Sequence, residues 1–142
     1  MRRLPALLLL ALTVLASAAE SRPNIVFILA DDLGYGEVGF MGQTKILTPN
    51  LDRMAKEGLV LTRHYCGNAV CAPSRSVLMT GLNPGRAPVR DNLDVGKGEQ
   101  IPLPAGITTL PNVLRQAGYK TGAFGKWGLG GYDSTGRPDV QG

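Results

Sequence analysis

The chain has 142 residues, a length that fits a single domain, because domains usually take about 100–200 residues. Its 15 basic and 11 acidic residues give a formal net charge of +4 at pH 7. The basic residues are scattered and are not interleaved with aromatic residues, so the composition argues against a nucleic-acid-binding protein.

Residues 1–18 have the pattern of a secretory signal peptide. Arg2 and Arg3 precede an almost entirely apolar run at 4–15, and Ala16-Ser17-Ala18 supplies small residues for a cleavage site. The run is shorter than the roughly 20 residues that span a bilayer, so we expect cleavage and no stable membrane anchor. The mature part, residues 19–142, is then exported to the periplasm or the extracellular space.

Strand and helix patterns alternate along the rest of the chain. The expected strands are residues 25–30, 59–65 and 119–124. The first of them is continuously apolar and rich in branched residues, which is typical of a strand buried on both faces of a parallel sheet. This alternation indicates an α/β fold with a mainly parallel central sheet, whose ligand site lies beyond the carboxyl ends of the strands.

Residues 49–58, 73–80 and 109–118 are the expected helices. Thr48 and Thr109 are suitable N-caps, and Pro73 fits the first turn of its helix because it needs no N–H partner there. Gly81 fits the position after the helix end. Residues 81–107 contain several prolines and glycines without periodicity, so we expect a functional loop or an insertion.

Cys71 lies where a loop enters the second of these helices, with Arg75 one turn further along. A helix N-terminus beside an arginine suits a tetrahedral oxyanion and favours chemistry at the sulfur atom. Cys66 is the only other cysteine, and an exported protein can form disulfides. From the residues alone, a Cys66–Cys71 bridge and a reactive cysteine are equally good interpretations.

Asp31 and Asp32 directly follow the first expected strand, and their hard oxygens suit Ca²⁺ or Mg²⁺. A turn or capping role is the alternative for this pair. Lys126, taken alone, reads as a surface lysine. His64 is the only histidine, so neither a zinc-binding histidine cluster nor a complete serine triad can be built from the chain.

Several segments together resemble the type I sulfatases of the alkaline phosphatase superfamily. Cys71-Ala72-Pro73-Ser74-Arg75 is similar to the family's Cys-x-Pro-Ser-Arg signature, and residues 23–36, 48–52 and 125–127 resemble further family blocks in the same order. The resemblance implies a sulfuric ester hydrolase with an alkaline-phosphatase-like α/β sandwich. The chain would hold the amino-terminal part of this domain and would be inactive alone, because the family's later metal ligands have no match.

The resemblance also assigns roles to residues. Cys71 would be oxidised before folding to formylglycine, the aldehyde whose hydrate attacks the sulfur of a sulfate ester. Arg75 and Lys126 would stabilise the sulfate and the nucleophile, while Asp31 and Asp32, with position 71, would bind a divalent metal, usually Ca²⁺. The implied partners are an aryl or carbohydrate sulfate as substrate and a formylglycine-generating maturation enzyme.

One departure from the family lies in the block Gly125-Lys126-Trp127-Gly128. Gly128 stands where arylsulfatases carry a histidine, which removes one hydrogen-bond donor and indicates a distinct subgroup. Two alternatives therefore stay open. The first is a phosphate or phosphonate ester hydrolase of the same superfamily, and the second is an inactive exported fragment with a Cys66–Cys71 disulfide.

Overall fold

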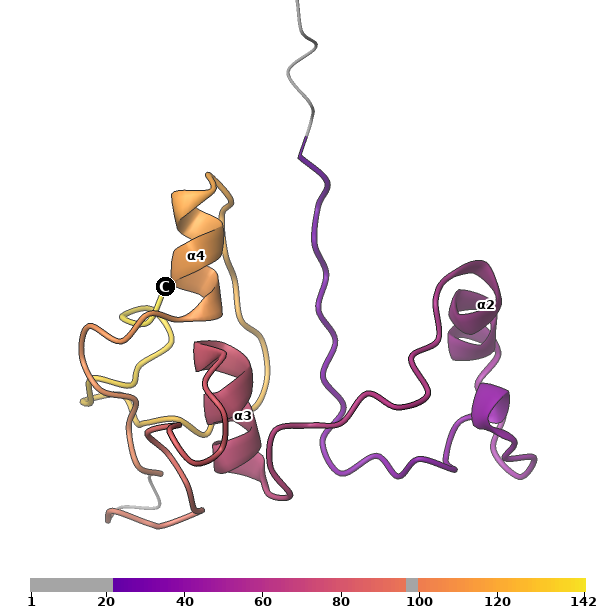
Figure 1. The fold of residues 1–142 in the computed structure, drawn as a ribbon, viewed down its shortest axis with the longest axis horizontal. Helices are drawn as coiled ribbons and strands as arrows, with labels where there is room; N and C mark the ends of the chain where they lie inside the picture. The colour runs from indigo at the N-terminus through magenta and orange to yellow at the C-terminus, as the bar shows by residue number, and fades with distance from the viewer. Residues whose placement is uncertain (1–21, 97–99) are drawn as a thin grey trace, which may run out of the picture. The chain divides into compact units, whose positions relative to one another are not determined.

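The structure is a computed structural model that describes residues 22–96 and 100–142 (Figure 1). The expected signal peptide, residues 1–18, lies outside the described residues. The chain divides into two compact units, Met1–Asp32 and Leu33–Gly142. Within the described part, no helix is both long enough and apolar enough to cross a membrane.

The described part of the first unit is an extended segment without regular secondary structure. Its apolar run, residues 25–29, has side chains that are between 44% and 82% exposed. The prediction of a strand buried on both faces is therefore wrong for this structure. The physical reason is that a strand needs a neighbour about 4.8 Å away to satisfy its backbone groups, and no described residue forms that ladder.

In the second unit, a short 3-10 helix η1 (Gly39–Met41) contacts α2 (Pro49–Glu57). The predicted α2 is confirmed, but Thr48 does not cap its own helix. Its hydroxyl accepts a hydrogen bond from the Gly39 N–H (2.8 Å) and donates one to Asp52 (3.0 Å). The threonine therefore ties η1 to α2 instead of closing the first turn of α2.

Helix α3 (Cys71–Thr80) is the central element for the site, and it contacts α4 (Leu110–Gln116) (Figure 1). Pro73 lies in its first turn as predicted, and Gly81 ends it with φ +66°, a left-handed conformation that glycine adopts without strain. A small core of four buried residues packs around this helix: Ala72, Val89, Leu103 and Leu129. The core thus joins α3 to segments far along the chain.

Helix α4 confirms its predicted N-cap. Thr109 and Asn112 form a capping box, in which the Thr109 N–H donates to Asn112 Oδ1 (3.0 Å) and the Asn112 N–H donates to Thr109 Oγ1 (3.4 Å). The Thr109 hydroxyl also lies 2.6 Å from the carbonyl oxygen of Gln141, which is buried. The last residues of the chain are therefore packed onto the start of α4.

The other two expected strands are also absent from the described residues. Residues 59–65 and 119–124 have no ladder partner, and the only β-pairing in the described part is an isolated antiparallel bridge between Asp94 and Gln100. Periodicity within one segment indicates which side chains could share a face, but a sheet exists only where a second segment supplies the hydrogen bonds. The described residues therefore form helices and loops without a central sheet.

Candidate functional site

Cys71 is the first residue of α3, half-buried, and its thiol forms no disulfide. The exposed side chain of Lys126, 55 positions further along the chain, places its Nζ atom 3.3 Å from Cys71 Sγ. An ammonium group is thus held against the sulfur atom by tertiary structure. This contact joins two segments that the sequence predicted to act together.

Arg75 lies one helical turn after Cys71 and fixes the segment that carries Lys126. Its Nη1 atom donates a hydrogen bond of 2.5 Å to the backbone carbonyl oxygen of Lys126. The bond uses the backbone of Lys126, so the lysine's side chain stays directed at Cys71. The structure therefore brings Cys71, Arg75 and Lys126 together, with two cationic groups at the start of α3.

The segment after Lys126 is anchored in the core. The Trp127 indole N–H donates to the Gly136 carbonyl oxygen (2.6 Å), and the Leu129 carbonyl oxygen accepts from the Leu103 N–H (3.0 Å). Leu129 is fully buried, and Trp127 packs against the same core. Trp127 is thus a packing residue of the core.

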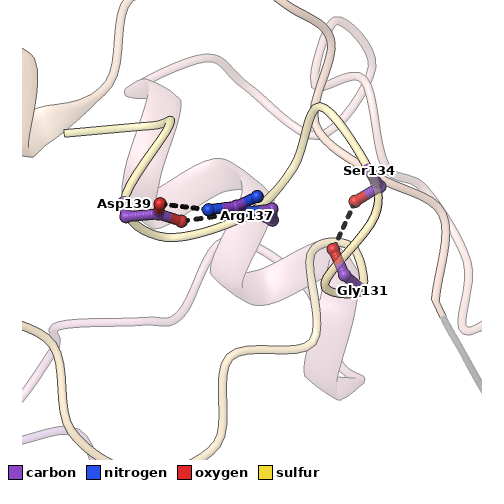
Figure 2. Close-up of polar contacts among 4 residues, drawn as sticks. All are labelled: Gly131, Ser134, Arg137 and Asp139. Carbon is purple, nitrogen blue, oxygen red and sulfur yellow. Dashed lines mark hydrogen bonds and ion pairs between the residues drawn. The ribbon is translucent and has the colours of Figure 1, made fainter.

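The loop further along is braced by its own side chains (Figure 2). Arg137 makes two contacts with Asp139, of 3.0 Å and 2.5 Å, and the Ser134 hydroxyl donates to the Gly131 carbonyl oxygen (2.8 Å). The hydrogen bond to Asp139 raises the pKa of Arg137, and the same bond lowers the pKa of Asp139. The stabilisation from this pair is therefore present at neutral pH and is lost as the pH falls through the lowered pKa of Asp139.

Asp31 and Asp32 lie at the end of the first unit, and both are exposed. Asp32 has φ +59° and is the only non-glycine residue among those described with a left-handed backbone. Aspartate is among the few residues that visit this region, which is often found at functional sites. Two adjacent carboxylates are a donor set that fits a hard divalent cation such as Ca²⁺.

The segments that carry Asp31, Cys71 and Lys126 all lie in a region that is similar to known proteins. The sequence model of the family described as Sulfatase matches residues 23–142. The chain belongs to the sulfatase family. Human steryl-sulfatase is 40% identical over 132 residues, which cover 90% of this chain and 23% of that protein.

Two further relatives come from distant organisms. Bovine arylsulfatase A is 47% identical over 116 residues, covering 80% of this chain and 22% of the relative. An N-acetylgalactosamine-6-O-sulfatase of Bacteroides thetaiotaomicron is 40% identical over 112 residues, covering 78% of this chain and 21% of the relative. The chain thus spans less than a quarter of the length of each of these three sulfatases.

Gly128, the residue that departs from the sulfatase pattern, lies at the site itself. It has φ +72°, and a Cβ atom built on it would lie 3.7 Å from the Cδ atom of Arg75. A histidine at this position would be strained by the left-handed backbone. Gly128 therefore has a backbone conformation that suits glycine.

Two other candidates from the sequence, Cys66 and His64, are not part of the cluster around Cys71. Cys66 is exposed, and its thiol donates to the Asn68 carbonyl oxygen (3.0 Å), so the Cys66–Cys71 disulfide of the alternative reading is not formed in the structure. His64 is exposed in a loop rather than in a strand. Among the described residues, no hydrogen bond links Cys66 or His64 to Cys71 or Lys126.

Sequence reasoning missed one residue near the site, Asn92. It lies in the segment 81–107, where the sequence showed only prolines, glycines and no periodicity. Its Oδ1 atom accepts a hydrogen bond of 2.9 Å from the N–H of Ala72, the second residue of α3. Val70 before the helix has no capping side chain, which signals that an acceptor must come from elsewhere, but nothing in the sequence says from where.

Proposed function

We propose that this chain is the amino-terminal part of the catalytic domain of an exported sulfatase, which hydrolyses sulfate esters with a formylglycine made from Cys71. The complete domain would have the alkaline-phosphatase-like α/β sandwich, with residues 19–142 contributing its first segments. The observation that carries the proposal is the contact between Cys71 Sγ and Lys126 Nζ, with Arg75 holding the lysine's backbone. The positive charge of Lys126 beside position 71 supports a site that attracts a sulfate group to the nucleophile.

Each residue has a defined task in this proposal. Position 71, once oxidised, supplies an aldehyde hydrate with two hydroxyl groups, of which one attacks sulfur and the other later allows sulfate to leave. The Sγ atom in the structure stands in for these oxygens, so the Lys126 ammonium 3.3 Å away binds and neutralises the developing negative charge. Arg75 keeps Lys126 in place and adds a second positive charge.

Asp31 and Asp32 are the proposed calcium ligands. They are neighbouring, exposed carboxylates, and calcium prefers about 6–8 oxygen ligands, so the pair would form one part of a larger shell. When bound, the cation draws charge from the sulfate oxygens and lowers the pKa of the attacking hydroxyl. Position 71 would lie at the same ion, as the family resemblance implies.

The maturation enzyme and the export route complete the proposal. The segment Cys71–Arg75 begins a helix in the folded structure, so an enzyme that oxidises Cys71 would have to read the motif before α3 forms. The signal-peptide pattern of residues 1–18 supports export to the periplasm or the extracellular space.

The first prediction concerns the chemical state of position 71. In full-length protein from its own host, the peptide 64–75 should carry an aldehyde at position 71, seen by mass spectrometry as loss of one sulfur and two hydrogen atoms and gain of one oxygen. The same preparation should hydrolyse an aryl sulfate faster than the matching aryl phosphate. A Cys66–Cys71 disulfide would contradict the proposed nucleophile, and faster phosphate hydrolysis would favour a phosphate or phosphonate ester hydrolase.

The second prediction concerns metal removal. Treating the full-length enzyme with a calcium chelator should lower sulfatase activity by on the order of 10²-fold or more, because the ion provides several kcal/mol of charge stabilisation. Adding Ca²⁺ should restore it. Asp31→Asn should raise the calcium concentration needed for half-maximal activity, whereas Asp133→Asn, which changes an exposed carboxylate elsewhere, should not. Full activity in the chelator would exclude the proposed metal site.

A further inference from the structure

The first turn of α3 lacks its usual local partners. Val70 offers no side-chain cap, Pro73 has no N–H, and the Ser74 N–H is already bonded to the Val70 carbonyl oxygen (3.0 Å). The N–H groups of Cys71 and Ala72, also in the first turn, therefore need acceptors from outside the turn. The Ala72 N–H finds its acceptor 20 residues away, in the side chain of Asn92 (2.9 Å).

Asn92 is delivered by a segment that is fixed to the middle of the same helix. We name residues 87–92 the α3 strap. From this strap, the Val89 N–H donates to the hydroxyl of Ser76 in α3 (3.3 Å), and both residues are fully buried. Arg90 donates from Nε to the Ala87 carbonyl oxygen (3.3 Å), which stiffens the strap. The strap therefore holds α3 at two points, one in its core face and one at the turn that carries Cys71.

We infer that Asn92 is a positioning residue for the nucleophile: by bonding the Ala72 N–H, it fixes the orientation of position 71 toward Lys126. This inference rests on the proposed sulfatase function. The Cys71 Sγ atom lies 3.3 Å from Lys126 Nζ. A small rotation of the first turn of α3 would therefore break this contact. A displacement of about 1 Å at a reacting group can lower the rate by on the order of 10²-fold.

The neutral amide of Asn92 suits this position better than a carboxylate would. An aspartate would also accept the Ala72 hydrogen bond and would be favoured by the helix dipole. Its negative charge, however, would stand beside the place where an anionic substrate binds. Asparagine therefore caps the helix without weakening the attraction for sulfate.

The test compares three variants of the full-length enzyme, with activity expressed per formylglycine. Asn92→Ala should lower kcat by about 10–100-fold with KM changed less than about threefold, because the defect lies in orientation rather than in substrate binding. Asn92→Asp should restore kcat to within about threefold and raise KM, because the acceptor returns with a negative charge. Asn83→Ala is the matched control, since the Asn83 side chain accepts from the Arg86 N–H outside the strap, and the bond from the Ala87 N–H goes to the Asn83 backbone carbonyl, which alanine keeps.

Amide deuterium exchange gives a second readout that does not depend on activity. Exchange at Ala72 should be at least about tenfold faster in Asn92→Ala than in the wild type, and should return to the wild-type rate in Asn92→Asp. If Asn92→Ala does not fold, Asn92→Gln, which keeps the amide but displaces its oxygen, takes its place. Unchanged exchange at Ala72, or equal kcat in wild type and Asn92→Ala, would overturn the inference. An enzyme that hydrolyses no sulfate ester, yet shows these exchange changes, would overturn the proposed function alone.

Discussion

Cys71→Ala is expected to abolish sulfate ester hydrolysis by the full-length enzyme, with kcat reduced at least about 10⁴-fold. Alanine has no thiol to oxidise, so position 71 would carry neither the aldehyde nor a hydroxyl group beside Lys126. The measurement is steady-state turnover of an aryl sulfate. Cys66→Ala is the matched control, because Cys66 is exposed and its thiol donates to the Asn68 carbonyl oxygen; it should keep wild-type turnover.

Cys71→Ser distinguishes the proposed chemistry from ordinary nucleophilic catalysis. Wherever the serine stays unmodified, it supplies one hydroxyl group, which can attack sulfur, but no second hydroxyl to expel the sulfate. We expect a single round of reaction that leaves a sulfated enzyme, detectable by mass spectrometry of the intact protein. Equal loss of turnover in Cys66→Ala and Cys71→Ala would point to a disulfide between the two cysteines instead.

Lys126→Ala is expected to lower kcat/KM for sulfate esters by on the order of 10²–10³-fold, because it removes an ammonium group held 3.3 Å from the nucleophile position. The structure indicates that this substitution removes the charge without displacing the backbone. Arg75 bonds the backbone carbonyl oxygen of Lys126, so the alanine variant keeps the tie between α3 and the Lys126 segment. The loss of rate then reports the missing charge and not a displaced loop.

Two further variants serve as comparisons for Lys126→Ala. Lys120→Ala removes an exposed lysine elsewhere in the same part of the chain and should leave kcat/KM within about twofold. Lys126→Arg keeps the charge but changes its geometry, so we expect activity between those of wild type and Lys126→Ala. If Lys126→Ala and Lys120→Ala behaved alike, the contact with position 71 would have no part in the reaction.

The helices were predictable because their signals are local. Pro49 at the start of α2, Gly81 after α3, and the Thr109–Asn112 capping box all act within a few residues of the element they define. Sequence alone could therefore place three α-helices with small errors at their ends. The misassigned role of Thr48 has the same explanation, because its hydroxyl is used by Gly39, nine residues before it.

The strands were not predictable in the same way, because pairing is a property of two segments. Residues 25–30, 59–65 and 119–124 carry suitable side chains, yet none has a ladder partner among the described residues. The same limit applies to the site. Proximity of Cys71 and Lys126 followed from the resemblance to a family, whereas Asn92 bonds across 20 residues with no local signal at all.

The exposed apolar run at residues 25–29 has a consequence for handling the protein. A short, exposed segment rich in branched apolar residues, without charge or proline and without a ladder partner among the described residues, is a template for aggregation between chains. Pro23 precedes the run and Asp31 and Asp32 follow it, which is the arrangement of gatekeeper residues that keep such segments soluble. Calcium binding would neutralise the two carboxylates, so the ion that we propose for catalysis would also remove the charge that keeps incompletely folded chains apart.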